Sequence, residues 1–303
     1  MDRDPYNDRI LPFFFYPLRF EFVARETISF PRGQAANILR GAFGLAFRRV
    51  ACVADCQGAA GCEIRQTCAY ARVFEPRAAE AGPSGLADWP RPFVFRARHL
   101  DGRTFEPGEE FHFDLNLFMG DAHVRGYLNR TFADLADEGL GPTRAKAAPL
   151  RFPGETIEPV VLDLAPALTP VHHIRVDFLT ATELKHDSEI AARPEFAILF
   201  SRIRDRVATL ARLYNGSPLA IDFRATNEAA AAIRMTCFDG TWHEYRRRST
   251  RTGQVHPIGG FTGYAEYEGN LTEFGPILKA GQYTGAGRQA VWGKGELLVR
   301  FSV

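Results

Sequence analysis

The pattern of apolar and polar positions in the first half of the chain predicts an α/β module. Apolar residues at helical spacing predict helices over 33–50 and 122–138. Alternating or short apolar runs predict strands at 12–23, 93–98, 110–119 and 157–164. The order is therefore strand, helix, two strands, helix, strand, which is the pattern of a ferredoxin-like fold.

The second half of the chain loosely repeats this order. Strands are predicted at 171–184, 232–238, 241–248, 258–267 and 290–303, and helices at 196–214 and 271–279. Asp239-Gly240 separates two strand-like runs and predicts a hairpin turn between them. The segment 165–170 (APALTP) is typical of a linker, so we expect an N-terminal domain over 1–165 and a C-terminal domain over 171–303.

Four cysteines form the sharpest local motif, Cys52-x3-Cys56-x5-Cys62-x5-Cys68. In a reducing compartment, clustered thiols favour a metal over disulfides, and four thiolates can close a tetrahedral site. We therefore expect a Cys-rich insertion at 51–76 that binds structural zinc, with an iron–sulfur cluster as the alternative. A closed four-sulfur site leaves no position open for a substrate, so no catalytic metal is expected. A loop of small residues with incidental thiols is the other interpretation.

Composition and charge narrow the possible classes of protein. The chain has 303 residues, of which 46% are hydrophobic, so it can form a substantial core and is not a disordered protein. Its 37 basic and 36 acidic residues nearly cancel, but residues 241–303 hold eight Lys/Arg against five Glu. The start, Met-Asp-Arg-Asp, does not resemble a basic signal peptide, and no long apolar run follows. We expect a cytoplasmic protein with no membrane partner.

Two segments of this basic region predict contacts with a phosphate backbone. The glycine-rich run before the last strand is neither a P-loop nor a Rossmann fingerprint, and we expect it to expose backbone N–H groups beside basic side chains. Its candidate residues are Gly285, Gly287, Arg288, Gly293, Lys294 and Gly295. The second segment contributes Arg246, Arg247, Arg248 and Arg251. An ordinary glycine-rich turn and a solvated strand end are the alternative interpretations.

Among the eight histidines, His256 is the strongest chemical candidate, because it lies in the basic C-terminal region directly before Pro257. His112 and His123 lie within patterned elements and are interpreted as structural. The sequence contains neither a His-Glu-x-x-His motif nor a Gly-x-Ser-x-Gly motif, so no zinc-peptidase or serine-hydrolase site is indicated.

Several segments share their order and spacing with a known family. They are LRGAFG at 39–44, CAYARVFEP at 68–76, FLTATELK at 178–185, Arg248-Ser249-x-Arg251, GGFTG at 259–263 with Tyr267-x-Gly269, and the glycine-rich tail. Together they resemble the CRISPR-associated RAMP proteins that process precursor crRNA, the sixth Cas family. The resemblance spans most of the chain and is densest over 171–303.

The resemblance implies an α+β fold of two tandem ferredoxin-like (RRM-like) domains, with the glycine-rich loop near RNA. It also implies metal-independent cleavage of repeat RNA, in which the 2′-hydroxyl attacks the adjacent phosphorus and leaves a 2′,3′-cyclic phosphate. Many members carry a catalytic histidine in or near the first helix, whereas 33–50 contains none. His256 is then the candidate base, with Arg40, Arg32 and Lys279 as candidate cations.

Three functions remain open. The first is an endoribonuclease that binds CRISPR repeat RNA and releases crRNA. The second is a non-catalytic RNA-binding RAMP subunit of a CRISPR effector complex, in which other Cas effector subunits would be partners. The third, which depends on the cysteines alone, is a metal-sensing or redox protein that does not bind RNA.

Overall fold

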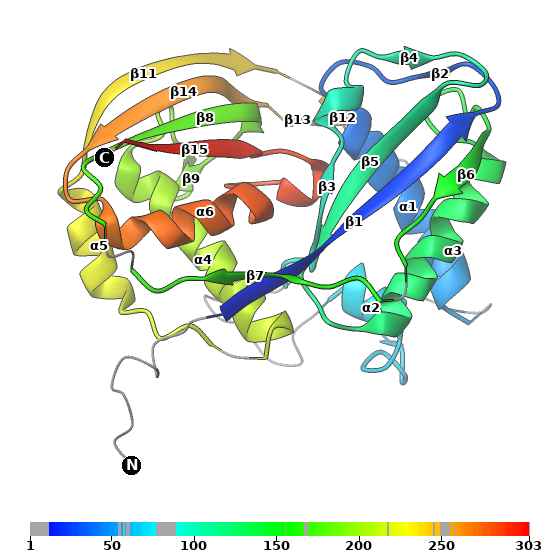
Figure 1. The fold of residues 1–303 in the computed structure, drawn as a ribbon, viewed down its shortest axis with the longest axis horizontal. Helices are drawn as coiled ribbons and strands as arrows, with labels where there is room; N and C mark the ends of the chain where they lie inside the picture. The colour runs from blue at the N-terminus through cyan, green and yellow to red at the C-terminus, as the bar shows by residue number, and fades with distance from the viewer. Residues whose placement is uncertain are drawn as a thin grey trace. The chain divides into compact units, whose positions relative to one another are not determined.

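The computed structural model describes residues 12–302, except 54–55, 57, 59–60, 77–88, 155, 167–168, 217, 245, 249–254 and 258. The chain divides into two compact units. The first is Phe15–Val160, and the second is Val161–Val303 together with the start of the chain as far as Phe14. Each unit is built on an antiparallel sheet with helices packed on it (Figure 1).

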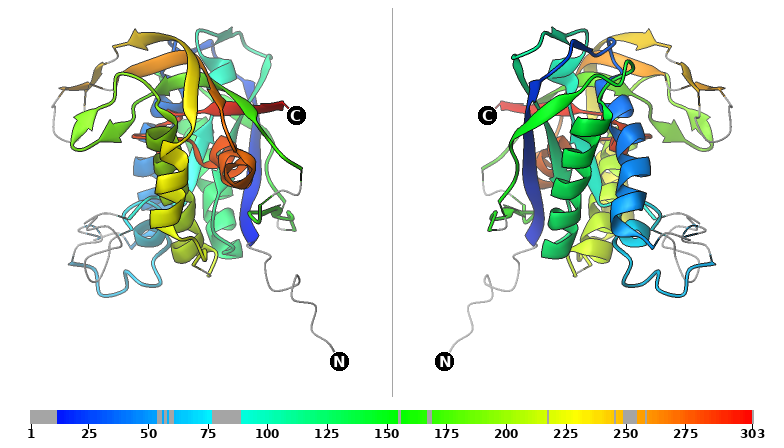
Figure 2. Two further views of the ribbon diagram at one scale, coloured as in Figure 1. Left: turned by 90° about the vertical axis from the view of Figure 1, so that its left-hand side faces the viewer. Right: turned by 90° about the vertical axis from the view of Figure 1, so that its right-hand side faces the viewer.

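The sheet of the first unit has the order β3-β5-β1-β6. Its strands are β1 (Pro12–Ala24), β3 (Phe93–Arg96), β5 (Glu110–Leu117) and β6 (Ala147–Arg151), and β7 (Val160–Asp163) also pairs with β1. The helices α1 (Ala35–Ala51) and α3 (Ala122–Glu138) lie side by side (Figure 2). Shorter elements are β2 (Ile28–Ser29), α2 (Ala69–Val73), η3 (Arg98–Leu100) and β4 (Thr104–Phe105).

The alternation predicted for β1 separates a core face from a polar face. Phe20 and Phe22 are fully buried, and Phe20 lies 4.4 Å from Phe132 of α3 between ring centroids. On the opposite face Arg19 pairs with Asp114 of β5 at 2.7 Å. The first unit therefore buries one face of its sheet under the helices and leaves a charged face uncovered within the unit.

The second unit repeats this architecture, with the sheet order β11-β14-β8-β15. Its sheet strands are β8 (His173–Thr182), β11 (Arg234–His243), β14 (Gly260–Glu268) and β15 (Leu297–Ser302). Its helices are α4 (Phe196–Tyr214), α5 (Phe223–Ala231) and α6 (Gly275–Thr284), with 3-10 turns η4 (Thr272–Phe274) and η5 (Ala290–Trp292). Two small hairpins pair β9 (Lys185–His186) with β10 (Glu189–Ile190) and β12 (Arg246–Arg248) with β13 (Val255–Pro257).

Both units place their strands in the same relative order. If the four main strands of a unit are numbered along the chain, each sheet reads second, third, first, fourth. With a helix after the first and third strands, this is the ferredoxin-like fold. The predicted fold class of two tandem ferredoxin-like domains is therefore confirmed.

The predicted hairpin at Asp239-Gly240 is wrong. β11 runs straight through both residues, which pair with Tyr264 and Gly263 of β14. Gly263 has φ +129°, and a Cβ there would lie 2.0 Å from the carbonyl oxygen of Asp239. These glycines therefore permit a close approach of two strands instead of forming a turn.

Candidate functional site

The glycine-rich segment of the second unit folds closely against the end of β8. Gly285, Gly287, Gly293 and Gly295 all have φ between +66° and +75°. A Cβ on Gly295 would lie 1.9 Å from the oxygen of Ala286, and one on Gly287 would lie 2.3 Å from the oxygen of Glu183. The glycines therefore serve both a left-handed backbone and tight packing on neighbouring backbone.

The prediction that this segment exposes a run of backbone N–H groups is wrong for several of its amides. Ala286 donates to Gly295, Arg288 donates to Glu183, and Gly295 donates to Ala181, at 2.9, 2.9 and 3.1 Å. Its two cations also differ, because the side chain of Lys294 is buried whereas that of Arg288 is 52% exposed and pairs with Glu183. Arg288 is thus the cation that this segment presents at the surface.

The basic segment after β11 forms the hairpin of β12 and β13. Its strands pair Arg246 with Pro257, Arg247 with His256 and Arg248 with Val255. The fold thus brings the candidate base His256 next to the candidate RNA-binding arginines, since His256 lies directly across the hairpin from Arg247. The hairpin is described by its backbone alone, and Arg251 lies outside the described residues.

The three other candidate cations occupy different environments. Arg40 is only 9% exposed, and its guanidinium lies 4.6 Å from the centre of the Phe74 ring, so it packs inside the first unit. Arg32 is exposed just before α1, and its side chain runs beside Gly102. Lys279 is exposed on α6, with its ammonium 5.2 Å from the centre of the Phe301 ring.

The polar face of the second sheet carries a network of charges around an aromatic ring. Arg175 of β8 lies 3.6 Å from the centre of the Tyr264 ring, and its guanidinium also contacts Asp177 at 2.8 Å and Glu266 at 3.5 Å. The hydrogen bond to Asp177 is the main cause that raises the pKa of Arg175. Unlike a bare aromatic platform, this face presents a stacked cation.

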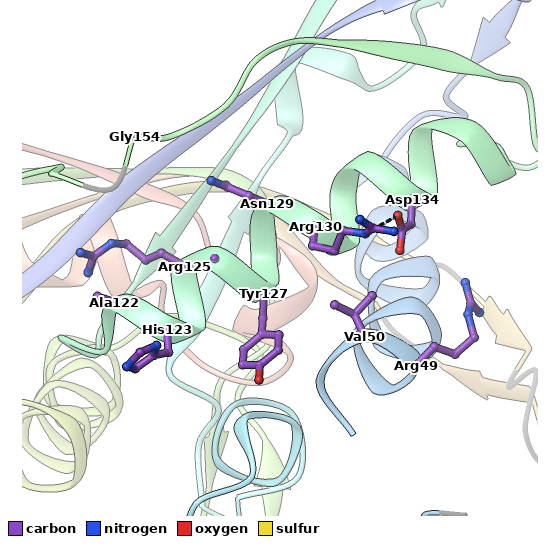
Figure 3. Close-up of a pocket in the computed structure, with 11 residues that line it drawn as sticks. Arg49, Val50, Ala122, His123, Arg125, Tyr127, Asn129, Arg130, Asp134 and Gly154 are labelled. Atoms are coloured by element: carbon purple, nitrogen blue, oxygen red, sulfur yellow. Dashed lines mark ion pairs between the residues drawn. The ribbon is translucent and has the colours of Figure 1, made fainter. Parts of the chain in front are cut away.

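The first unit has a groove of about 920 Å³ along α3 and the end of α1 (Figure 3). It is lined by Arg49, Val50, Ala122, His123, Arg125, Gly126, Tyr127, Asn129, Arg130, Asp134 and Gly154. Arg130 pairs with Asp134 at 2.9 Å, and Arg49 pairs with Glu138. Two of its three arginines are therefore neutralised by carboxylates, which makes the groove less basic than its composition indicates.

Two histidines that sequence reasoning did not connect meet on the polar face of the first sheet. The imidazoles of His99 in η3 and His112 in β5 are stacked, with ring centroids 4.4 Å apart. In the sequence, the alternation along β5 could have placed His112 on the polar face, because it puts His112 on the same side as Asp114. The alternation could not identify His99, because the stacking of His99 on His112 depends on a tertiary contact between η3 and β5.

The four cysteines follow α1 and are all reduced. The sulfur atoms of Cys52 and Cys68 lie 4.0 Å apart, and the amide of Gly58 donates to the sulfur of Cys56 at 3.3 Å. Burial, followed by hydrogen bonding to Cys56, raises the pKa of Cys52 to about 12. Among the described residues no three metal-ligating side chains are grouped, so a four-cysteine site stays a prediction.

Comparisons with known proteins agree with this architecture. Residues 176–297 match the family model of the CRISPR-associated endoribonuclease Cas6, and residues 11–156 match the model AF_1859_N, described as an N-terminal domain. The product complex of Thermus thermophilus Cas6 (TTHB231) shares the fold with TM-score 0.55 and 16% identity, over 94% of this chain and 100% of that one. Residues 176–297 are therefore similar to the Cas6 family, and the chain shares the fold of this structure.

Two further solved structures share this fold. The product complex of Cas6 (TTHA0078) gives a TM-score of 0.52 at 15% identity, over 96% of this chain and 100% of that one. A partial Cas6-RT-Cas1–Cas2 complex gives 0.53 at 12% identity, over 96% of this chain but 46% of that one. No curated protein matches the sequence significantly. In the part of the chain that the structure describes, no helix is long and apolar enough to cross a membrane.

Proposed function

We propose that this protein binds the repeat RNA of a CRISPR precursor transcript and cleaves it to release crRNA. The observation that carries the proposal is the match of residues 176–297 to the Cas6 endoribonuclease family, on a chain whose two units both have the ferredoxin-like fold. The partners are then repeat RNA, the crRNA product and other Cas proteins. Structural relatives that are themselves product complexes support an RNA ligand for this fold.

The proposed reaction needs no metal ion. The ribose 2′-oxygen loses its proton and bonds to the adjacent phosphorus, while the bond from phosphorus to the 5′-oxygen breaks and that oxygen gains a proton. The products are a 2′,3′-cyclic phosphate and a 5′-hydroxyl. The protein must align the attacking and leaving oxygens, accept a proton and stabilise charge on the phosphate.

The candidate residues have different support for these tasks. Arg32 and Lys279 are exposed, and Arg288 presents its cation beside Glu183. Arg40 is packed against Phe74, so contact with a phosphate would require its side chain to leave that packing. His256 is paired with Arg247 across the hairpin, and this backbone position opposite the arginine-rich strand β12 suits contact with a phosphate backbone.

The alternative is a non-catalytic RNA-binding subunit of an effector complex. The absence of histidine from Ala35–Ala51 favours it, because α1 then offers no imidazole as a general base. One assay separates the two functions. Purified protein is incubated in EDTA with a repeat transcript and with the same transcript carrying a 2′-deoxy sugar at the cleaved position.

Cleavage of the first RNA but not of the second, with a 2′,3′-cyclic phosphate on the product, supports the endoribonuclease. Tight binding of an RNA that stays intact rejects catalysis and supports the binding subunit. Failure to bind repeat RNA better than an unrelated RNA rejects both.

We also propose that Cys52, Cys56, Cys62 and Cys68 bind a structural zinc ion, with an iron–sulfur cluster as the alternative. The support is the 4.0 Å separation of the Cys52 and Cys68 sulfur atoms. In a tetrahedral zinc site with Zn–S bonds of about 2.3 Å, two sulfur atoms lie about 3.8 Å apart. Such a site would fix the segment between α1 and α2 and take no part in RNA chemistry.

A further inference from the structure

The stacked histidines on the first unit differ in how the fold holds them. His99 is exposed and is carried by η3, whereas His112 is half-buried on β5. Their ring planes are inclined by only 26°, and the Nε2 atom of His99 lies 2.8 Å from the backbone oxygen of His112. His112 thus supports His99 with its imidazole ring and with its backbone carbonyl group.

This hydrogen bond determines the tautomer of His99. A carbonyl oxygen can only accept, so Nε2 of His99 must carry the hydrogen and donate it. In the neutral ring Nδ1 is then the basic nitrogen, and it belongs to an exposed side chain. A histidine whose second nitrogen is held by a fixed acceptor has the arrangement required of a general base.

The groups around the pair keep the supporting ring neutral. Burial, the imidazole of His99 and the guanidinium of Arg19 hold the pKa of His112 below its usual range, opposed by the carboxylates of Asp114 and Glu21. Arg19 is itself held by Asp114 at 2.7 and 3.1 Å. At neutral pH His112 is therefore an uncharged ring on which His99 can stack.

The segment that carries His99 is joined to a candidate cation. Asp101, two residues later, accepts hydrogen bonds from the amides of Gln34 and Ala35 at 3.1 and 2.9 Å and so holds the start of α1. The next residue, Gly102, packs against the side chain of Arg32, since a Cβ there would lie 3.0 Å from Arg32 Cγ. The fold thus fixes the imidazole segment and Arg32 to the same end of α1.

We propose that His99 is a catalytic base of RNA cleavage in this protein and that His112 is its positioning residue. The proposal rests on the endoribonuclease function proposed above. Nδ1 of His99 takes the proton from the 2′-hydroxyl as the 2′-oxygen bonds to phosphorus. The bond from phosphorus to the 5′-oxygen breaks, and the departing oxygen takes a proton from water.

The first test compares cleavage and binding in three proteins. His99→Ala is expected to slow single-turnover cleavage in EDTA by about 100-fold or more while RNA affinity is unchanged. His186→Ala is the matched control, because His186 is also an exposed histidine but contacts the carboxylate of Asp187 at 3.3 Å and stacks on no second imidazole among the contacts described. This variant should cleave like the wild type. Added imidazole should restore part of the activity of His99→Ala and leave the control unaffected.

The second test separates positioning from folding. His112→Phe keeps an aromatic ring under His99 and keeps the backbone carbonyl, so it should retain most of the cleavage rate. His112→Ala removes the ring and should lose about tenfold. RNA affinity and the thermal melting temperature of both variants are measured as the check on folding.

The outcomes distinguish this inference from the proposed function. If the wild type cleaves and His99→Ala cleaves equally well, the role of His99 is refuted and the endoribonuclease stands. If His99→Ala loses RNA binding in parallel with cleavage, His99 is a binding residue and the inference is also refuted. If the wild type binds repeat RNA but never cleaves it, the catalytic function and this inference both fall.

Discussion

Replacement of Gly295 by alanine tests the packing of the glycine-rich segment directly. Gly295 has φ +66°, a left-handed backbone that costs an alanine about 1–2 kcal/mol. In addition, a Cβ at this position would lie 1.9 Å from the carbonyl oxygen of Ala286. The two backbone segments would therefore have to separate by about 1 Å before an ordinary contact is reached.

That separation removes specific hydrogen bonds. Gly295 accepts from the amide of Ala286 at 2.9 Å and donates to the oxygen of Ala181 at 3.1 Å. Weakening both adds about 2 kcal/mol to the backbone strain, since each such bond contributes about 1 kcal/mol. We expect Gly295→Ala to lower the free energy of unfolding by about 3–4 kcal/mol.

The matched control is Gly216→Ala in the same unit. Gly216 has φ +81°, but nothing lies within 4 Å of the Cβ that it would gain, so only the backbone strain of about 1–2 kcal/mol applies. Scanning calorimetry should give a melting temperature for Gly295→Ala about 4–8 °C below that of Gly216→Ala. Equal losses in the two variants would refute the close contact between Gly295 and Ala286 and the role assigned to the loop glycines.

Three further perturbations have expected outcomes. The pKa of His112 is lower in the folded chain than the ordinary 6.5, so the unfolded state binds the proton first and stability falls as the pH drops through about 6.5; urea unfolding of His112→Phe should lack this loss, and an identical pH dependence would contradict it. Elemental analysis should find about one zinc per chain, lost in Cys68→Ser and kept in Cys237→Ser, and a metal content insensitive to Cys68 would exclude the site. Arg288→Ala should weaken repeat-RNA binding and lower the salt slope by about one, whereas Arg224→Ala on α5 should not; equal affinities would remove Arg288 from the interface.

The helices were the most predictable elements of this chain. The predicted ranges 122–138 and 196–214 coincide with α3 and α4, because a long amphipathic period repeats the same signal over several turns. α5 was missed, although Asp222 accepts from the amides of Arg224 and Ala225 and so marks its start. Its alanine-rich sequence gives little periodicity.

The errors in the predicted strands have a different origin, and the first of them is that β6 was not predicted. β6 is the end strand of its sheet and includes Pro149, which breaks the alternation that predicts strands but is tolerated at an edge. The turn expected at Asp239-Gly240 does not form because β14 pairs with β11 along its length. A turn signal is local, whereas that pairing joins residues far apart in the sequence.

In the candidate site too, the sequence predicted local features but not tertiary contacts. Glycines 285, 287, 293 and 295 were identified from sequence, but their amides were expected to face a ligand and several instead bind neighbouring backbone. The stack of His99 on His112 depends on η3 returning to β5, and no spacing in the sequence encodes that approach. The composition of the sequence therefore identified the glycine-rich segment, but tertiary contacts determine which of its backbone amides remain available to a ligand.

The position of Arg175 on Tyr264 has a consequence for how the second sheet would meet a nucleobase. The guanidinium of Arg175 covers one face of the Tyr264 ring at 3.6 Å. On that face a nucleobase would therefore stack on the flat guanidinium and not on the aromatic ring. A base that stacks on this layer gains a charged neighbour. A contact between a cation and an uncharged base is short-ranged, so attraction at this position would depend less on ionic strength than a contact with phosphate does.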